Sequence, residues 1–122
     1  MTTTHHGSCH CGAVRFAVDL DLSSDEIVEC DCSVCTKKGI LHVIVPPARF
    51  RRLTPEAPLT TYTFGTHTAK HTFCPVCGMH PFYTPRSHPE HVDVNVRCLD
   101  DLDWRRLPVK AFGGRNWEQN ID

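Results

Sequence analysis

The sequence lacks the features of a membrane-bound, secreted or nucleic-acid-binding protein. It has no apolar run near the roughly 20 residues that a bilayer-spanning helix needs. It has no excess of one charge, since 13 Lys and Arg accompany 14 Asp and Glu, whereas nucleic-acid binding requires a basic face. Residues 1–6 lack the basic start and apolar stretch of a secretory signal. We therefore expect a cytoplasmic protein with neither a membrane nor a nucleic-acid partner.

Helical periodicity is also scarce, which favours β-structure. The 122 residues, 40% hydrophobic and 22% charged, fit one soluble domain over 1–122 with its core at about 7–118. Short alternating or apolar runs between Gly, Pro and Thr are typical of strands. They predict strands over 13–18, 26–29, 40–45, 59–64, 67–73, 79–84, 92–97 and 107–112, and helical turns over 33–39 and 116–119. The fold class is therefore predicted to be mainly β.

The regions between these elements carry weaker expectations. Residues 1–6 are predicted to be a polar lead, 19–25 an acidic loop and 48–58 an irregular connection. The strands 59–64 and 67–73 should form a hairpin about Gly65. Pro81 should restrict 79–84 to a sheet edge or a bulge, and the three valines of 92–97 should point inward.

Cysteine is the residue type that most clearly indicates chemistry. The chain has eight cysteines, and in a reducing compartment such a number favours metal ligation over disulfides. Cys74-x-x-Cys77 followed by Gly78 is typical of a zinc knuckle. Cys9-x-Cys11 can supply two more thiols from one side of a strand. We predict a closed structural zinc site from these four cysteines; a redox role for Cys74 and Cys77 would require a βαβ context that is missing here.

Cys30, Cys32 and Cys35 form a second, denser cluster. A helical turn from Ser33, its expected cap, to Gly39 would direct backbone N–H groups at the sulfurs of Cys32 and Cys35. Three thiolates without a local fourth ligand indicate a catalytic zinc site that keeps one position open.

Other residues compete for that position. Cys98 is either a fourth ligand or, as is commoner for a lone cysteine, a small buried hydrophobe. His10, His42, His71 and His80 are each expected to be packed or exposed rather than ligands, although any of them could act as a base near the open site.

Several motifs resemble the glutathione-dependent formaldehyde-activating enzyme family. They are GSCHCGAVRF at 7–16, the Cys30-x-Cys32-x-x-Cys35 cluster, FCPVCG at 73–78, CLD at 98–100 and NWE at 116–118. Residues 62–64 and 82–87 are similar to its centromere protein V branch. The resemblance implies an Mss4-like β-tent around a structural zinc held by Cys9, Cys11, Cys74 and Cys77. It also implies a catalytic zinc held by Cys30, Cys32 and Cys35.

Two features depart from that family. Gly-Met-His-Pro-Phe stands at 78–82 where the family usually has Gly-Thr-x-Leu-Phe, so the wall of the pocket should differ. The basic extension of the centromeric relatives is missing, so a chromatin or microtubule role is not expected.

The resemblance implies a zinc-dependent carbon–sulfur lyase that joins glutathione to formaldehyde. Lys37 and Lys38 would attract the carboxylates of the tripeptide. The alternative is a non-catalytic zinc-stabilised module that binds another protein, with the second site closed, for example by Cys98. A third hypothesis treats the dense thiols as a redox switch or a metal buffer.

Overall fold

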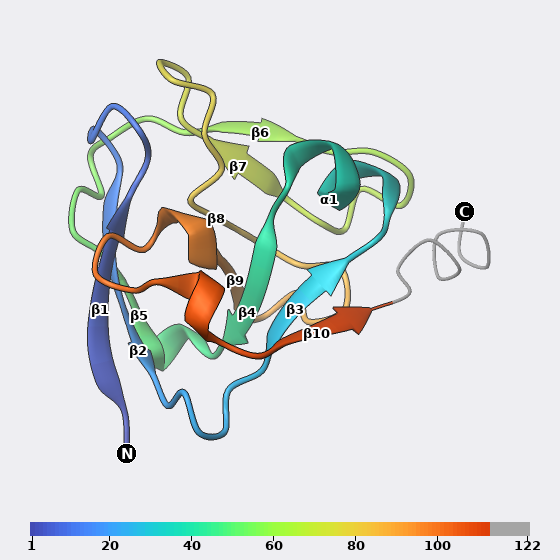
Figure 1. Cartoon of the computed structure of the whole chain (residues 1–122). Coiled ribbons are helices and arrows are strands. Elements are labelled where there is room, and N and C mark those ends of the chain that lie inside the picture. Colours follow the sequence, from blue (N-terminus) through green and yellow to red (C-terminus); the bar gives the residue numbers. More distant parts are fainter. Residues whose placement is uncertain (113–122) are drawn as a thin grey trace.

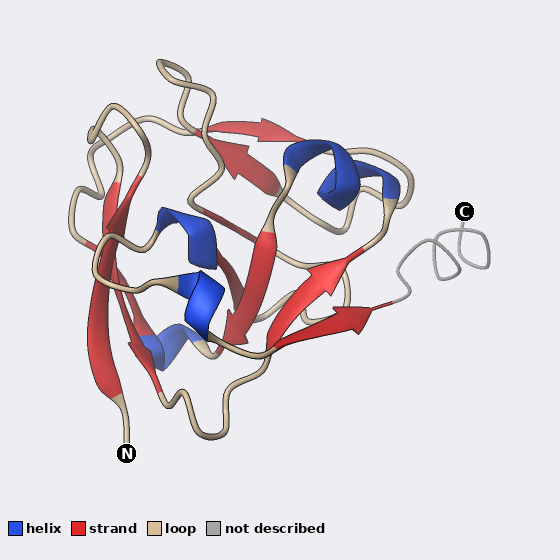
Figure 2. Ribbon diagram, in the orientation of Figure 1, coloured by secondary structure: helices blue, strands red, loops and turns tan. Residues whose placement is uncertain are grey.

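The fold is described from a computed structural model, which places residues 1–112. Strands and loops make up nearly all of this part of the chain, with a few short helical segments (Figure 2). The strands are β1 (Thr3–Ser8), β2 (Arg15–Leu20), β3 (Ile27–Cys30), β4 (Leu41–Val45), β5 (Phe50–Arg52), β6 (Thr60–Tyr62), β7 (His71–Phe73), β8 (Phe82–Tyr83), β9 (Val92–Asn95) and β10 (Val109–Phe112). The helical segments are α1 (Ser33–Lys38), η1 (Pro47–Arg49), η2 (Val96–Cys98) and η3 (Trp104–Arg106). The prediction of a mainly β fold is confirmed.

A three-stranded antiparallel sheet in the order β1-β2-β5 forms one side of the molecule (Figure 1). Two of its strands were not predicted. Residues 1–6 were expected to be a polar lead, yet β1 begins at Thr3 and pairs with β2 along its whole length. Only His5 and Gly7 of β1 are buried, so the strand is held by backbone pairing rather than by an apolar pattern. β5 lies within the expected irregular connection 48–58 and has no fully buried residue.

A five-stranded sheet in the order β10-β3-β4-β9-β8 lies beside the first (Figure 1). The edge strand β10 pairs with β3 in parallel, while the other neighbours are antiparallel. Phe16 of β2, Phe50 of β5 and Phe82 of β8 join the two sheets, with ring centroids 4.8 to 5.7 Å apart. The core therefore lies between these sheets.

The expected strand at 92–97 is shorter in the structure. It ends at Asn95 because the side chain of that residue accepts a hydrogen bond from the Arg97 N–H at 3.2 Å and begins the 3₁₀ turn η2. Val94 and Val96 are fully buried, as expected, whereas Val92 is only half-buried. Asp93 and Asn95, which alternation would place outward, are buried too.

The other predicted elements are found with changed ends. The hairpin of β6 and β7 is present, although its loop spans 63–70. β8 lies at the edge of its sheet, as Pro81 predicted. The cap of α1 is Cys32 rather than Ser33, and Gly39 ends the helix with a φ of 67°. The helical turn predicted at 116–119 and the motif at 116–118 lie outside the described residues. No helix of residues 1–112 is long and apolar enough to cross a membrane.

Candidate metal centres

The sulfurs of Cys9, Cys11, Cys74 and Cys77 all lie within 4.8 Å of one another. Cys9 and Cys11 belong to the turn between β1 and β2, and Cys74 and Cys77 to the turn after β7. The Sγ of Cys11 is 3.6 Å from that of Cys9 and 3.7 Å from that of Cys74. Tetrahedral zinc with sulfur ligands at about 2.3 Å requires sulfurs about 3.8 Å apart. This cluster therefore fits a four-thiolate zinc.

Backbone amides support negative charge on these sulfurs. The Val14 N–H donates to the Sγ of Cys9 at 3.3 Å. The N–H groups of Cys11 and Met79 bond to the Cys77 sulfur and help to lower the pKa of its thiol to about 6. Gly78 has a φ of 75°, as expected for the residue after the knuckle. The cluster thus connects two turns about 65 residues apart in the sequence. Its backbone N–H groups stabilise the thiolate form of the cysteines.

Cys30, Cys32 and Cys35 form the second cluster, with all three sulfurs within 4.8 Å of one another. Cys30 ends β3, and the other two belong to the start of α1. The thiols of Cys30 and Cys35 and the Cys35 N–H bond to the Cys32 sulfur and lower its pKa to about 2. The hydrogen bond with Cys32 raises the pKa of Cys30, and hydrogen bonds with Cys30 and then Cys32 raise the pKa of Cys35. One thiolate supported by two neighbouring thiols fits a soft divalent cation such as zinc, which favours all three as thiolates.

Cys98 is the eighth cysteine and belongs to neither cluster. Its side chain is buried, and its thiol donates to the carbonyl oxygen of His80 at 3.8 Å. Burial raises its pKa to about 12. Cys98 therefore has the environment of a small buried hydrophobe.

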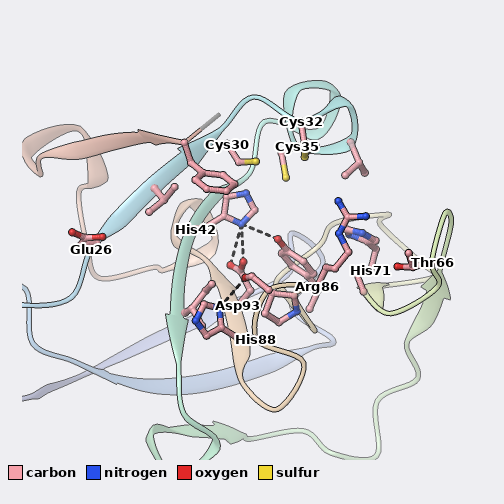
Figure 3. A pocket seen from close by; sticks show the side chains of 18 of the residues that line it. Glu26, Cys30, Cys32, Cys35, His42, Thr66, His71, Arg86, His88 and Asp93 are labelled. Carbon is pink, nitrogen blue, oxygen red and sulfur yellow. Dashed lines mark hydrogen bonds and ion pairs between the residues drawn. The ribbon is translucent and has the colours of Figure 1, made fainter. Parts of the chain in front are cut away.

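A cavity of about 590 Å³ opens beside the second cluster (Figure 3). Cys30, Cys32 and Cys35 lie at one end of it. Apolar side chains form much of the wall, among them Val28, Ile44, Phe64, Pro85 and Phe112. Binding pockets for organic molecules typically measure about 300–1,000 Å³. The space thus suits a ligand much larger than a two-carbon aldehyde.

A buried polar group faces the thiols from across this cavity. Nδ1 of His42 is 3.0 Å from both carboxylate oxygens of Asp93 and 3.0 Å from the Tyr83 hydroxyl. All three side chains are less than a tenth exposed, and the opposite edge of the His42 ring is directed at Cys30 and Cys35 (Figure 3). Sequence reasoning placed His42 among the packed histidines and missed Asp93 and Tyr83. The sequence offered one signal for this group, because Asp93 is an acidic residue inside a valine-rich strand.

The other histidines have different surroundings. His10 is exposed, and His80 packs against Phe73. His71 stacks on Phe64 and Tyr83, and burial followed by the charge of Lys38 lowers its pKa to about 4. His71 lines the same cavity as His42, and its buried Nδ1 has no hydrogen-bond partner among residues 1–112.

Cationic residues lie near the cavity and the second cysteine cluster. Lys38 is half-buried, with its ammonium 5.4 Å from the centre of the Tyr62 ring, whereas Lys37 is exposed. Arg86 and His88 line the cavity. Arg86 lies next to His71 (Figure 3), and sequence reasoning did not identify it.

Comparison with known proteins identifies the family of this chain. A family model described as glutathione-dependent formaldehyde-activating enzyme matches residues 4–113. The chain belongs to this family. The residues matched to the glutathione-dependent formaldehyde-activating enzyme family include all eight cysteines.

A solved structure extends the comparison to the fold. A crystal structure of a Rhodobacter sphaeroides protein is 38% identical to this chain, with a TM-score of 0.77. The alignment covers 88% of this chain and 99% of the other. The Mss4-like fold expected for the formaldehyde-activating family is therefore the fold of this protein.

Proposed function

We propose that this protein is a zinc-dependent carbon–sulfur lyase that reversibly joins a thiol, such as glutathione, to formaldehyde or another small aldehyde. The observation that supports this most is the position of Cys30, Cys32 and Cys35 at one end of a cavity of about 590 Å³. In this proposal these three cysteines hold a catalytic zinc with one open position. Cys9, Cys11, Cys74 and Cys77 hold a structural zinc. The eight thiols, none in a disulfide, are consistent with a cytoplasmic location.

The catalytic zinc would favour the thiolate form of a substrate sulfur at neutral pH. The remaining contribution comes from the chain itself. The apolar wall formed by residues such as Phe64 and Phe112 excludes water from the reacting groups. Arg86 and Lys38 place positive charge where the carboxylates of a tripeptide thiol would lie. Because three thiolates make zinc a weak Lewis acid, positioning has to provide much of the acceleration.

Exchange NMR on glutathione and formaldehyde tests the proposal. The zinc-loaded protein should accelerate the exchange above the uncatalysed background. Cys32→Ser should lose both the acceleration and the second zinc, while Cys98→Ala, a matched cysteine control outside both clusters, should keep both. If the wild-type protein binds two zincs yet never exceeds the background, the lyase proposal is wrong. The chain would then be a zinc-stabilised interaction module.

A further inference from the structure

His42 is a polar residue of the cavity wall whose environment the metal clusters do not explain. Its Nε2 is buried and has no hydrogen-bond partner among the described residues, although an unpaired buried polar atom destabilises the fold by its lost hydration. The ring also lines the cavity that contains the three thiols. An atom of this kind is satisfied when a ligand occupies the cavity.

The partners of Nδ1 determine which form of the ring is present. When Asp93 is ionised its carboxylate offers only acceptor sites, so in that state Nδ1 carries the proton and donates it to Asp93. The Tyr83 hydroxyl also bonds to Asp93. Nε2 is then left with a free lone pair directed at the thiol end of the cavity (Figure 3).

Direct metal ligation by His42 fits the distances less well. Nε2 is not among the donor atoms that lie within 4.8 Å of one another around Cys30, Cys32 and Cys35. The ligands of one tetrahedral zinc lie about 3.5–4 Å apart. The ring is therefore set back from the cluster, at a place where it faces a molecule bound beside the sulfurs.

From this arrangement we infer that His42 is a catalytic residue, the proton shuttle between the substrate thiol and the aldehyde oxygen. Nε2 takes the proton of the thiol S–H, and the sulfur electron pair forms the C–S bond to the carbonyl carbon. The C=O π pair moves to the oxygen, which receives the proton back from Nε2. The product is the hemithioacetal, and His42 returns to its starting form. This inference rests on the proposed function, of which it specifies one step.

Asp93 and Tyr83 act as positioning residues in this scheme. The carboxylate of Asp93 stabilises the ring while both of its nitrogens carry protons. Burial raises the pKa of Asp93, and the hydrogen bonds from His42 and Tyr83 oppose that rise. His71 also lines the cavity, but its lowered pKa makes it a poor proton acceptor near neutral pH.

The first test counts protons and requires no turnover. Glutathione is titrated into the zinc-loaded full chain by calorimetry in two buffers of different ionisation enthalpy at pH 7. If His42 takes the thiol proton, the wild-type protein releases almost none to the buffer, whereas His42→Gln releases about one per thiol bound. His6→Ala, which removes an exposed histidine on β1, should match the wild type. Equal proton release in wild type and His42→Gln, or no thiol binding at all, overturns the inference.

The second test measures turnover by exchange NMR. His42→Gln should lower kcat by about 100- to 10,000-fold, the usual range for a general acid–base group, with KM for the thiol changed by less than about threefold and both zincs retained. Asp93→Asn should lower kcat by about tenfold or more. An unchanged kcat, or loss of the second zinc in His42→Gln, overturns the shuttle. If the wild-type protein shows the expected proton count but does not accelerate the exchange, the lyase proposal is wrong. His42 would then still be the residue that accepts the proton of the bound thiol.

Discussion

The backbone N–H of Cys35 lies 3.4 Å from the Sγ of Cys32, so a cysteine sulfur caps the one α-helix in residues 1–112. The Cys32 sulfur therefore caps the helix and also belongs to the second cysteine cluster. Folding the helix orients a ligand, and charge on that ligand stabilises the first turn of the helix.

Substitutions at position 32 should separate these two roles. Serine is a good N-cap but a poor zinc ligand, whereas alanine is neither. Both Cys32→Ser and Cys32→Ala should lose the second zinc, and the alanine variant should be less stable than the serine variant by about 0.5–2 kcal/mol. Zinc analysis and denaturant unfolding measure the two effects. Equal stability of the two variants would show that the cap contributes nothing.

The first cluster should matter much more for folding than the second. A structural zinc can contribute roughly 10–16 kcal/mol of apparent binding energy, and Cys74 is a buried member of its cluster. Cys74→Ser should therefore abolish cooperative thermal unfolding, while Cys32→Ser keeps a cooperative transition. Circular dichroism melts of the two variants provide the comparison. A cooperative melt of Cys74→Ser near the wild-type temperature would contradict the structural assignment.

Gly7 is required by close packing rather than by backbone conformation. A Cβ at this position would collide with the ring of Phe16 and would lie 2.7 Å from the Cys98 carbonyl oxygen. The backbone there cannot move freely, because Gly7 forms a bridge with Leu99. Gly7→Ala should lower the free energy of unfolding by about 1–3 kcal/mol, the usual cost of overpacking. His6→Ala, on an exposed neighbour in β1, should change it by less than about 0.5 kcal/mol.

The role of Cys98 can be tested directly. Its thiol lies against the His80 carbonyl and outside both clusters, so Cys98→Ala should bind as much zinc as the wild type. The expected cost is about 1 kcal/mol for a small cavity and a weak hydrogen bond. Elemental analysis of the purified variant is sufficient. If the variant binds one zinc fewer than the wild type, Cys98 is a zinc ligand and this assignment is wrong.

Stability should fall with acid in a way that His71 partly controls. The pKa of His71 is about 4 in the folded chain against 6.5 for an ordinary histidine. As the pH falls from about 6.5 towards 4, the unfolded state takes up this proton first, so the stability present above pH 6.5 is progressively lost. Between pH 7 and 5 this group can account for up to about 2 kcal/mol.

His71→Phe keeps the ring that stacks on Tyr83 and removes the titration. The variant should therefore lose less stability than the wild type over this pH range in guanidinium unfolding. Protonation of the zinc ligands has the same sign in both proteins, so the difference between them reports on His71. Parallel pH profiles would show that His71 is not the group responsible.

The strands that were predicted and those that were missed differ in one property. Residues 13–18 and 40–45 carry buried apolar side chains such as Phe16 and Val43, so their pattern indicates strands directly. β1 and β5 are held by pairing with β2, and their side chains are mostly polar. Pairing of this kind depends on a distant partner and leaves no periodic signal in the sequence.

The spacing of the cysteines determined how they divide into two groups. Cys74-x-x-Cys77, Cys9-x-Cys11 and the Cys30 cluster each bring their thiols together by local turn geometry. Local geometry needs only neighbouring residues, so the sequence by itself indicates each of these groups of thiols, and it also anticipates Gly39 and Gly78, whose positive φ ends a helix and a knuckle. Cys9-x-Cys11 and Cys74-x-x-Cys77 are far apart in the sequence, and the tertiary structure brings their four sulfurs together.

Only the tertiary structure decided what faces those sites. His42 and Asp93 are 51 positions apart and meet because β4 pairs with β9. Tyr83 joins them from β8, on the other side of β9. The register of three strands sets this contact, and the same register buries Asp93 on the face that alternation assigns to solvent. Register is a property of the whole sheet, so no pattern within one strand encodes it.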